Sequence, residues 1–93
     1  GAIIETNAVF RRDQVDPVYA GPMEGNIQAL TMRHVINQQN TLRAARECDR
    51  DLAWTTFIND PLMSKIEYRD GEKLFDQMLR AQKKYLPKGW KMD

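Results

Sequence analysis

Apolar and polar residues follow a strand-like pattern near the start of the chain. Residues 3–10 are rich in β-branched and aromatic side chains with imperfect alternation, which predicts a strand. Residues 11–14 are polar and predict a turn. Pro17 favours extended backbone over residues 15–19, because a residue that precedes proline is disfavoured in a helix. Residues 20–22, Ala-Gly-Pro, then break the chain again.

A long helix is predicted from about Asn26, where the period of the pattern changes. Each residue of a helix is rotated by about 100° from the one before it. On that basis a group of seven residues shares one side of this helix, in a stripe that covers about 100° of its circumference and is flanked by Leu30. The stripe consists of Ile27, Thr31, His34, Val35, Gln38, Leu42 and Ala45. Because its middle third is polar, this face either meets a polar neighbour or lines a water-filled space.

The helical pattern is interrupted at Cys48-Asp49 and then resumes. Asp49 is predicted as the N-cap of a second helix over residues 50–59, whose apolar side chains pair at i, i+4. Pro61 either ends that helix or starts a short further turn, because proline is tolerated only in the first turn of a helix.

A third helix is predicted over residues 72–86, with Asp70-Gly71 as its start signal. Its apolar residues share one side and its Lys and Gln residues the other. Pro87-Lys88-Gly89 ends it, and Trp90 is predicted as a packing anchor near the terminus.

These elements predict an α+β fold that is mainly helical, with three or four helices and a short N-terminal strand element. Ninety-three residues are enough for one small domain. We therefore treat residues 1–93 as one segment. The chain opens with Gly1-Ala2 rather than Met and continues directly with the apolar pair Ile3-Ile4. This start is interpreted as an expression scar followed by an excised piece of a longer chain; the alternative is a processed product.

Composition excludes several classes of partner. Fourteen basic and thirteen acidic residues give a net charge of +1, so nothing indicates nucleic-acid binding. The apolar runs are too short to span a membrane. A single cysteine and the lack of a signal-peptide pattern predict a cytoplasmic protein.

Catalytic motifs are missing from the sequence. It contains no Gly-rich phosphate loop, no CxxC, no HExxH and no serine-centred elbow. His34 and Cys48 lie roughly 20 Å apart along one predicted helix, so they cannot share a metal or form a dyad. We therefore predict no catalytic, cofactor-binding or metal-binding residue in this chain.

Individual polar residues have structural interpretations. His34 is interpreted as a half-buried helix histidine bonded to a backbone carbonyl; the alternative is that it lines a pocket completed by missing sequence. Cys48 is interpreted as an ordinary small residue at a helix end rather than a reactive thiol. Helix capping and turn formation are the interpretation of three acidic residues, Asp49, Asp51 and Asp60. A solvated helix face is the interpretation of four basic residues, Arg33, Arg43, Arg46 and Arg50.

Several short motifs, in order, resemble the C-terminal segment of glycoside hydrolase family 4. They are Ile3 to Phe10, Val15-Asp16-Pro17, Ala20-Gly21-Pro22, Thr41-Leu42-Arg43-Ala44-Ala45, Asp49-Arg50, Asp60-Pro61-Leu62 and Tyr85 to Trp90. The sequence departs from the family pattern where Asn7 replaces Pro, Arg43 replaces Glu and Cys48 replaces Gly. Glu5-Thr6-Asn7 and Arg33-His34-Val35 resemble the α-galacturonidase-like branch more than the α-galactosidases.

The resemblance implies a parent enzyme that uses NAD and a divalent metal, usually manganese. Such enzymes hydrolyse O-glycosyl bonds by oxidation, elimination, addition and reduction, rather than with two carboxylates. The family's NAD loop, metal-binding Cys and His and catalytic Tyr lie upstream of the matching segment. None maps onto Tyr19, His34, Cys48, Tyr68 or Tyr85.

The resemblance therefore makes this chain a structural segment of a larger α/β enzyme's C-terminal domain. We expect it to pack against the rest of the parent chain, which binds the carbohydrate substrate, and to self-associate when isolated. By itself it is expected to show no hydrolysis, no NAD binding and no tight manganese site. The alternative is a stand-alone helical protein-interaction module. An independent small enzyme would need clustered catalytic groups that the sequence lacks.

Overall fold

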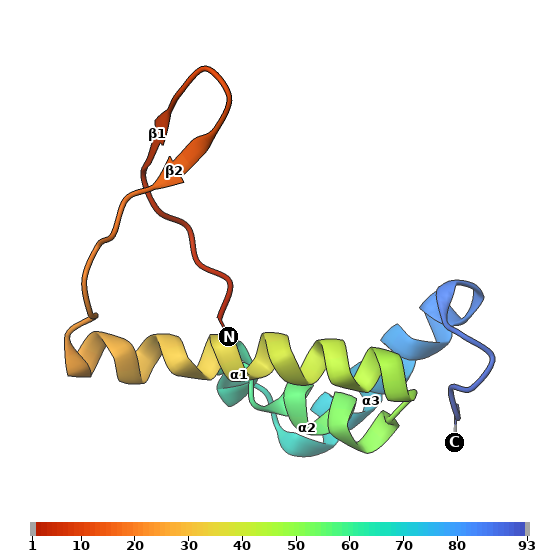
Figure 1. The fold of residues 1–93 in the computed structure, drawn as a ribbon. Coiled ribbons are helices and arrows are strands. Elements are labelled where there is room, and N and C mark those ends of the chain that lie inside the picture. The colour runs from red at the N-terminus through yellow and green to blue at the C-terminus, as the bar shows by residue number, and fades with distance from the viewer. Residues whose placement is uncertain (1, 93) are drawn as a thin grey trace.

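The computed structural model describes residues 2–92, in which a β-hairpin precedes three α-helices (Figure 1). The elements are β1 (Ala8–Phe10), β2 (Val15–Pro17), α1 (Gly25–Glu47), α2 (Arg50–Ile58), the 3₁₀ turn η1 (Pro61–Lys65), α3 (Tyr68–Gln82) and the 3₁₀ turn η2 (Lys83–Tyr85). This confirms the predicted fold class, a mainly helical α+β segment with a short N-terminal strand element.

The hairpin is shorter than the sequence predicts. β1 and β2 pair antiparallel, and the amide of Arg11 donates to the carbonyl of Gln14 across the predicted turn at 2.9 Å. The strand predicted over residues 3–10 is confirmed only at residues 8–10. Backbone pairing continues as far as the Val18 amide, which donates to the Asn7 carbonyl, and stops where the chain turns away around Gly21 (φ 82°). Residues before Asn7 therefore have no neighbouring strand within the described chain.

Two residues join α1 to α2, the left-handed Cys48 and the extended Asp49. Glu24 accepts a hydrogen bond from the amide of Asn26 at the start of α1, and Cys48 (φ 55°, ψ 36°) ends it. Asp49 then accepts from the amide of Leu52 at 2.9 Å and caps α2, as predicted. Cys48 thus occupies the C-cap position as a helix-end residue, in a conformation that favours glycine.

The strain at Cys48 gives a testable prediction. We expect Cys48→Gly to be more stable than Cys48→Ala by about 1 kcal/mol, because both remove the thiol but only glycine adopts the left-handed conformation without a Cβ penalty. Urea denaturation of the two variants measures this difference. Equal stabilities would contradict the strain.

The same position contacts the C-terminal tail. A Cβ added at Gly89 would lie 3.0 Å from the Cys48 Sγ, so Gly89→Ala should destabilise the native chain more than it destabilises the Cys48→Gly variant. A double-mutant cycle with these two substitutions measures the contact directly.

The start of α3 differs from the prediction. The helix begins at Tyr68, not at Asp70-Gly71, and Gly71 is buried within it. A Cβ at Gly71 would lie 3.2 Å from the Met63 Cε and 3.4 Å from the Ile58 Cδ1. Glycine is thus present because α3 approaches α2 and η1 closely, and the sequence pattern mistook this packing position for a helix break. The helical path continues through η2 to the predicted stop at Pro87.

A small aromatic cluster forms the core between α2 and α3. Phe75 is 6% exposed, and its ring centroid lies 5.4 Å from those of both Trp54 and Phe57. Tyr68 meets Trp54 edge-on at 5.5 Å and accepts a hydrogen bond from the Trp54 Nε1 at 3.3 Å. This cluster ties α3 to α2.

The face of α1 that packs against the rest of the bundle is not the predicted stripe. Ala44 is buried and Asn37 accepts a hydrogen bond from the side chain of Asn59 at 2.8 Å, so the packed face lies roughly 100° around the helix from the stripe. Within the stripe, Val35 is half-buried and the others are exposed, Ile27 by 55% and Leu42 by 53%. Four stripe residues, His34, Gln38, Leu42 and Ala45, line an open hollow instead, which is consistent with the predicted choice between a polar neighbour and a water-filled space.

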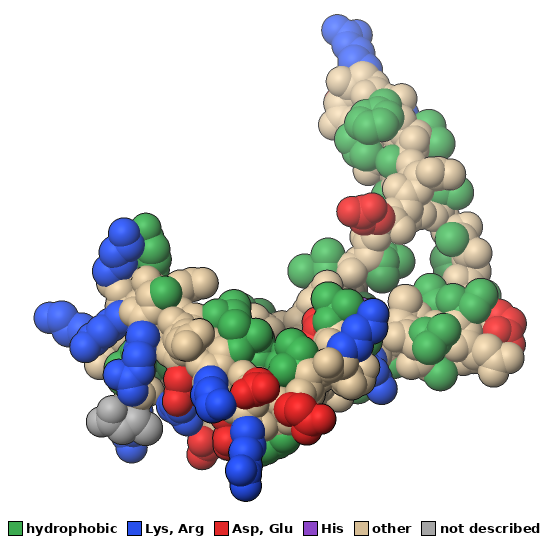
Figure 2. Space-filling model, turned by 180° about the vertical axis from the view of Figure 1, so that it is seen from behind, with side chains coloured by type: hydrophobic (Ala, Val, Ile, Leu, Met, Phe, Trp, Pro, Cys, Tyr) green, Lys and Arg blue, Asp and Glu red, His purple; other side chains and the backbone are tan. Residues whose placement is uncertain are grey.

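The described chain exposes far more surface than a folded domain of its mass. Its accessible area is 8142 Å², whereas a 10.8 kDa folded monomer exposes about 5,500 Å². The radius of gyration is 17.6 Å, against about 12 Å for a compact domain of this length. Figure 2 shows apolar side chains on the projecting hairpin and along the helices. Within residues 2–92, no helix is long and apolar enough to cross a membrane.

Candidate functional site

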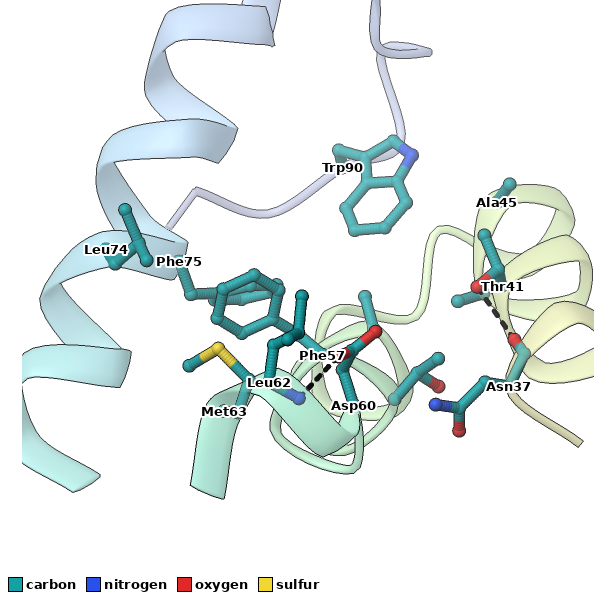
Figure 3. A pocket seen from close by; sticks show the side chains of 13 residues that line it. Asn37, Thr41, Ala45, Phe57, Asp60, Leu62, Met63, Leu74, Phe75 and Trp90 are labelled. Carbon is teal, nitrogen blue, oxygen red and sulfur yellow. Dashed lines mark hydrogen bonds between the residues drawn. The ribbon is translucent and has the colours of Figure 1, made fainter. Parts of the chain in front are cut away.

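An apolar groove of about 540 Å³ lies between the C-terminal half of α1, α2, η1, α3 and the tail (Figure 3). Its apolar lining comes from Ala44, Ala45, Ala53, Phe57, Leu62, Met63, Leu74, Phe75 and Trp90. Ala44 and Ala45 of α1 and Ala53 of α2 contribute small side chains to this lining, where the two helices pack together. The groove is therefore a product of helix packing.

The polar side chains that line the groove already make hydrogen bonds within the chain. Asn37 accepts from Asn59, and the Thr41 hydroxyl donates to the Asn37 carbonyl at 2.8 Å. The Thr56 hydroxyl donates to the Leu52 carbonyl at 2.7 Å. These hydroxyl and amide groups stabilise the helices, which leaves an apolar surface suited to packing.

Carboxylates near the groove also have structural partners. Asp60 accepts from the amide of Leu62 at 2.8 Å and caps η1, while Asp49 caps α2. This confirms the predicted capping and turn roles of these two residues. Asp51 is exposed in the first turn of α2, where a negative charge is favourable.

Trp90 forms one side of the groove from the C-terminal tail. In Figure 3 its indole lies between Phe75 of α3 and Ala45 of α1. The backbone turns there, with the Trp90 amide donating to the Pro87 carbonyl, and the side chain is half-buried, which confirms the predicted packing anchor. Its Nε1 is buried without a hydrogen-bond partner among residues 2–92.

His34 is exposed on the outer side of α1, so its interpretation as a half-buried histidine was wrong. The helix turns this side away from α2, which packs on a different face. His34 instead lines an open hollow of about 520 Å³ with Asn37, Gln38, Thr41, Leu42, Ala45 and Asp60. A pocket completed by further sequence stays a hypothesis for this residue.

Arg50 is the functional-looking residue that sequence reasoning missed. Arg33, Arg43 and Arg46 are exposed as predicted, but Arg50 is half-buried and forms an ion pair with Asp76 of α3. Its guanidinium lies 5.5 Å from the centroid of the Phe75 ring. The sequence held one signal for this ion pair. Asp76 directly follows an apolar residue of the third helix, and so lies at the edge of the packed side of that helix.

Metal-ligating side chains do not cluster in the described part of the chain. Among residues 2–92, no three His, Cys, Asp or Glu side chains are grouped so that they could hold a metal ion. His34 is exposed near the middle of α1, whereas Cys48 is half-buried at its end. The donor set of residues 2–92 does not fit a manganese site, and the sequence has no glycine pattern of a dinucleotide site.

Comparison with known proteins places this chain in an enzyme family. Residues 1–63 match the family 4 glycosyl hydrolase C-terminal domain. The chain is 47% identical over 92 residues to the alpha-galacturonidase of Thermoanaerobacterium saccharolyticum, covering 99% of this chain and 19% of that protein. The identity is 44% with the alpha-galacturonidase of Lachnoclostridium phytofermentans (98% and 20% covered) and 39% with that of Bacillus subtilis (86% and 18%).

No solved structure matches this chain. The chain spans about a fifth of the length of the curated relatives that it matches. Because the matched family domain covers two thirds of the chain and the relatives extend over almost all of it, the chain belongs to glycosyl hydrolase family 4.

Proposed function

We propose that this chain is a C-terminal structural segment of an α-galacturonidase-type glycosidase, which hydrolyses O-glycosyl bonds of galacturonides. The observation that carries the proposal is identity of 39–47% to alpha-galacturonidases along nearly the whole chain. The geometry is consistent with a structural role, since the polar groups of the groove serve the helices themselves.

The chemistry of the whole enzyme belongs to residues outside this chain. Membership of the family implies NAD and a divalent metal, which supply redox chemistry at the sugar when bound. Residues 2–92 do not offer a donor set that fits either group. We therefore assign this segment no chemical step, and infer that it supports the active-site wall by packing against the substrate domain.

The test is an activity assay of the complete natural protein that contains this chain. With NAD and manganese present, we expect hydrolysis of 4-nitrophenyl α-galacturonide and little hydrolysis of the matched α-galactoside, which lacks only the carboxylate. Deleting residues 25–93 should reduce kcat/KM by roughly 100-fold or more, because the support of the site is lost. Preference for the galactoside, or full activity of the deletion variant, would contradict the proposal.

Self-association of the isolated 93-residue chain is a further prediction. Its exposed apolar surface should be partly covered by other copies, so light scattering should give a mass above 10.8 kDa that rises with concentration. A strict monomer over the range from about 10 μM to 1 mM would contradict this expectation.

The alternative of a stand-alone interaction module is favoured by one observation, the apolar groove, which has the character of a helix-binding site. The intact mass of the native polypeptide, captured from its source cells with an antibody to this chain, separates the two. A mass about five times 10.8 kDa supports the glycosidase, whereas a mass near 10.8 kDa supports the module.

A further inference from the structure

The first half of α1 exposes apolar side chains on two opposite sides. Ile27 and Leu30 are 55% and 76% exposed on one side, and Met32 and Ile36 are 41% and 45% exposed on the other. At about 100° per residue the centres of these two pairs lie roughly 170° apart around the helix. Every residue from 25 to 34 is exposed, so no described element covers either side.

Polar residues separate the two apolar sides. By the same periodicity, Arg33 lies between them along one edge of the helix, and Gln28 lies along the other, which the half-buried Val35 shares two turns further on. A helix on a protein surface has a single apolar stripe, whereas a helix that is apolar on several sides is buried. Covering one side of α1 would leave the other in water, so a flat partner surface cannot satisfy this pattern.

The second half of the same helix provides the contrast. There, packing comes from one face only, where Ala44 is buried and Asn37 is bonded to Asn59. α1 has 23 residues and is about 34 Å long, so its first half projects well beyond the bundle (Figure 1). The two halves of α1 are therefore built for different surroundings.

We propose that the first half of α1 is an interior helix of the complete protein, enclosed on both sides by the part of the same polypeptide that lies outside this chain. This proposal depends on one part of the proposed function, namely that the chain is a segment of a longer enzyme. The relatives are about five times longer, so enough polypeptide exists to surround a helix. A covalently linked partner also acts at about millimolar effective concentration.

The exposed area favours the same polypeptide over a second copy. The described chain exposes about 2,600 Å² more than a compact monomer of its mass, whereas a standard interface covers about 800 Å² on each partner. A dimer would cover one side of α1 at most. Enclosure within a larger domain accounts for both sides of α1.

Hydrogen exchange tests the enclosure. In the complete protein, backbone amides of residues 29–36 should exchange at least roughly 100-fold more slowly than in the isolated 93-residue chain, whereas amides of α2 should change far less. Equal exchange of residues 29–36 in the two proteins would overturn the proposal. The isolated chain is measured at a dilution where light scattering gives a constant mass, so that its expected self-association does not protect the helix. Protection of residues 29–36 in the complete protein that disappears when the complete protein is diluted to a monomer would indicate a second copy, and would overturn the proposal as well.

Three variants of the complete protein test whether both sides are enclosed. Leu30→Asp and Ile36→Asp place a carboxylate on opposite sides, and each should lower the Tm and the yield of folded protein. Gln28→Asp places the same carboxylate on a polar edge of the same half-helix and should have little effect. In the isolated chain, α1 should keep its helical content in both test variants.

Comparing the stability losses of Leu30→Asp and Ile36→Asp shows whether one side of α1 or both sides are enclosed. Loss of stability from only one of Leu30→Asp and Ile36→Asp would mean that α1 lies on a surface, which overturns the two-sided enclosure. If these variants fail to fold, the hydrogen-exchange comparison of the unmodified proteins still decides. Neither measurement uses enzyme activity, so a failure here is distinguishable from a failure to hydrolyse galacturonides.

Discussion

The free energy of unfolding of the isolated chain is expected to fall by about 3 kcal/mol in the Phe75→Ala variant, because truncating a buried phenylalanine loses its transfer energy and leaves a cavity. Phe75 is 6% exposed and contacts the rings of Trp54 and Phe57, as well as the Arg50 guanidinium. Urea denaturation followed by tryptophan fluorescence measures the change, at a protein concentration where light scattering gives a constant mass.

Phe10→Ala is the matched control for this measurement. It removes the same atoms from a side chain that is 80% exposed on the hairpin, so the stability of the isolated chain should change little. A similar loss in both variants would mean that the aromatic cluster between α2 and α3 is not the core of this segment.

The second large effect is expected from Gly71→Leu, which should destabilise the chain by about 2 kcal/mol through overpacking. A Cβ at this position already lies 3.2 Å from the Met63 Cε and 3.4 Å from the Ile58 Cδ1, and both neighbours belong to the packed bundle. The longer side chain would force α3 away from α2 and η1. Thermal and urea unfolding both measure the loss.

Gly25→Leu and Gly71→Ala are the controls for overpacking. Gly25 is also helical, but a Cβ there meets no atom within 4 Å, so leucine should be tolerated. Gly71→Ala gains about 1 kcal/mol of helix propensity and needs only a small shift of the flexible Met63 side chain, so it should be close to neutral. Equal effects of leucine at positions 71 and 25 would contradict the close approach of α3.

Local signals in the sequence predicted most of the helical elements. Asp49 and Asp60 reach the amides three and two residues ahead of them, and capping of this kind needs only neighbouring residues. The family resemblance was also carried by short local motifs. These features were predictable because their physical causes lie within a few residues along the chain.

The remaining features depend on contacts between distant residues, which a pattern does not contain. Gly71 was interpreted as a helix start because its reason, the approach of Met63 and Ile58, is a tertiary contact. Arg50 was assigned to a solvated face because Asp76, its partner, is 26 residues away. The position and lining of the groove were not predicted either, since the groove needs α1, α3 and the tail around Trp90 in place.

The surroundings of α1 could not be predicted for a different reason. Periodicity shows which residues share a side of the helix, but it does not show what covers that side. Much of that apolar surface, including Ile27 and Leu30, faces no described element. A chain that spans about a fifth of its relatives' length need not contain the surface that an apolar side of one of its helices contacts.

The aromatic cluster has a consequence for the order in which this part of the protein folds. Trp54, Phe57, Tyr68 and Phe75 lie close together along the chain, so closing the loop between them costs little conformational entropy. Helices joined by short connections form contacts quickly, whereas contacts with distant sequence form late. The pair α2–α3 should therefore form early and act as a folding nucleus. The first half of α1 should pack against the rest of the complete protein only in the last step.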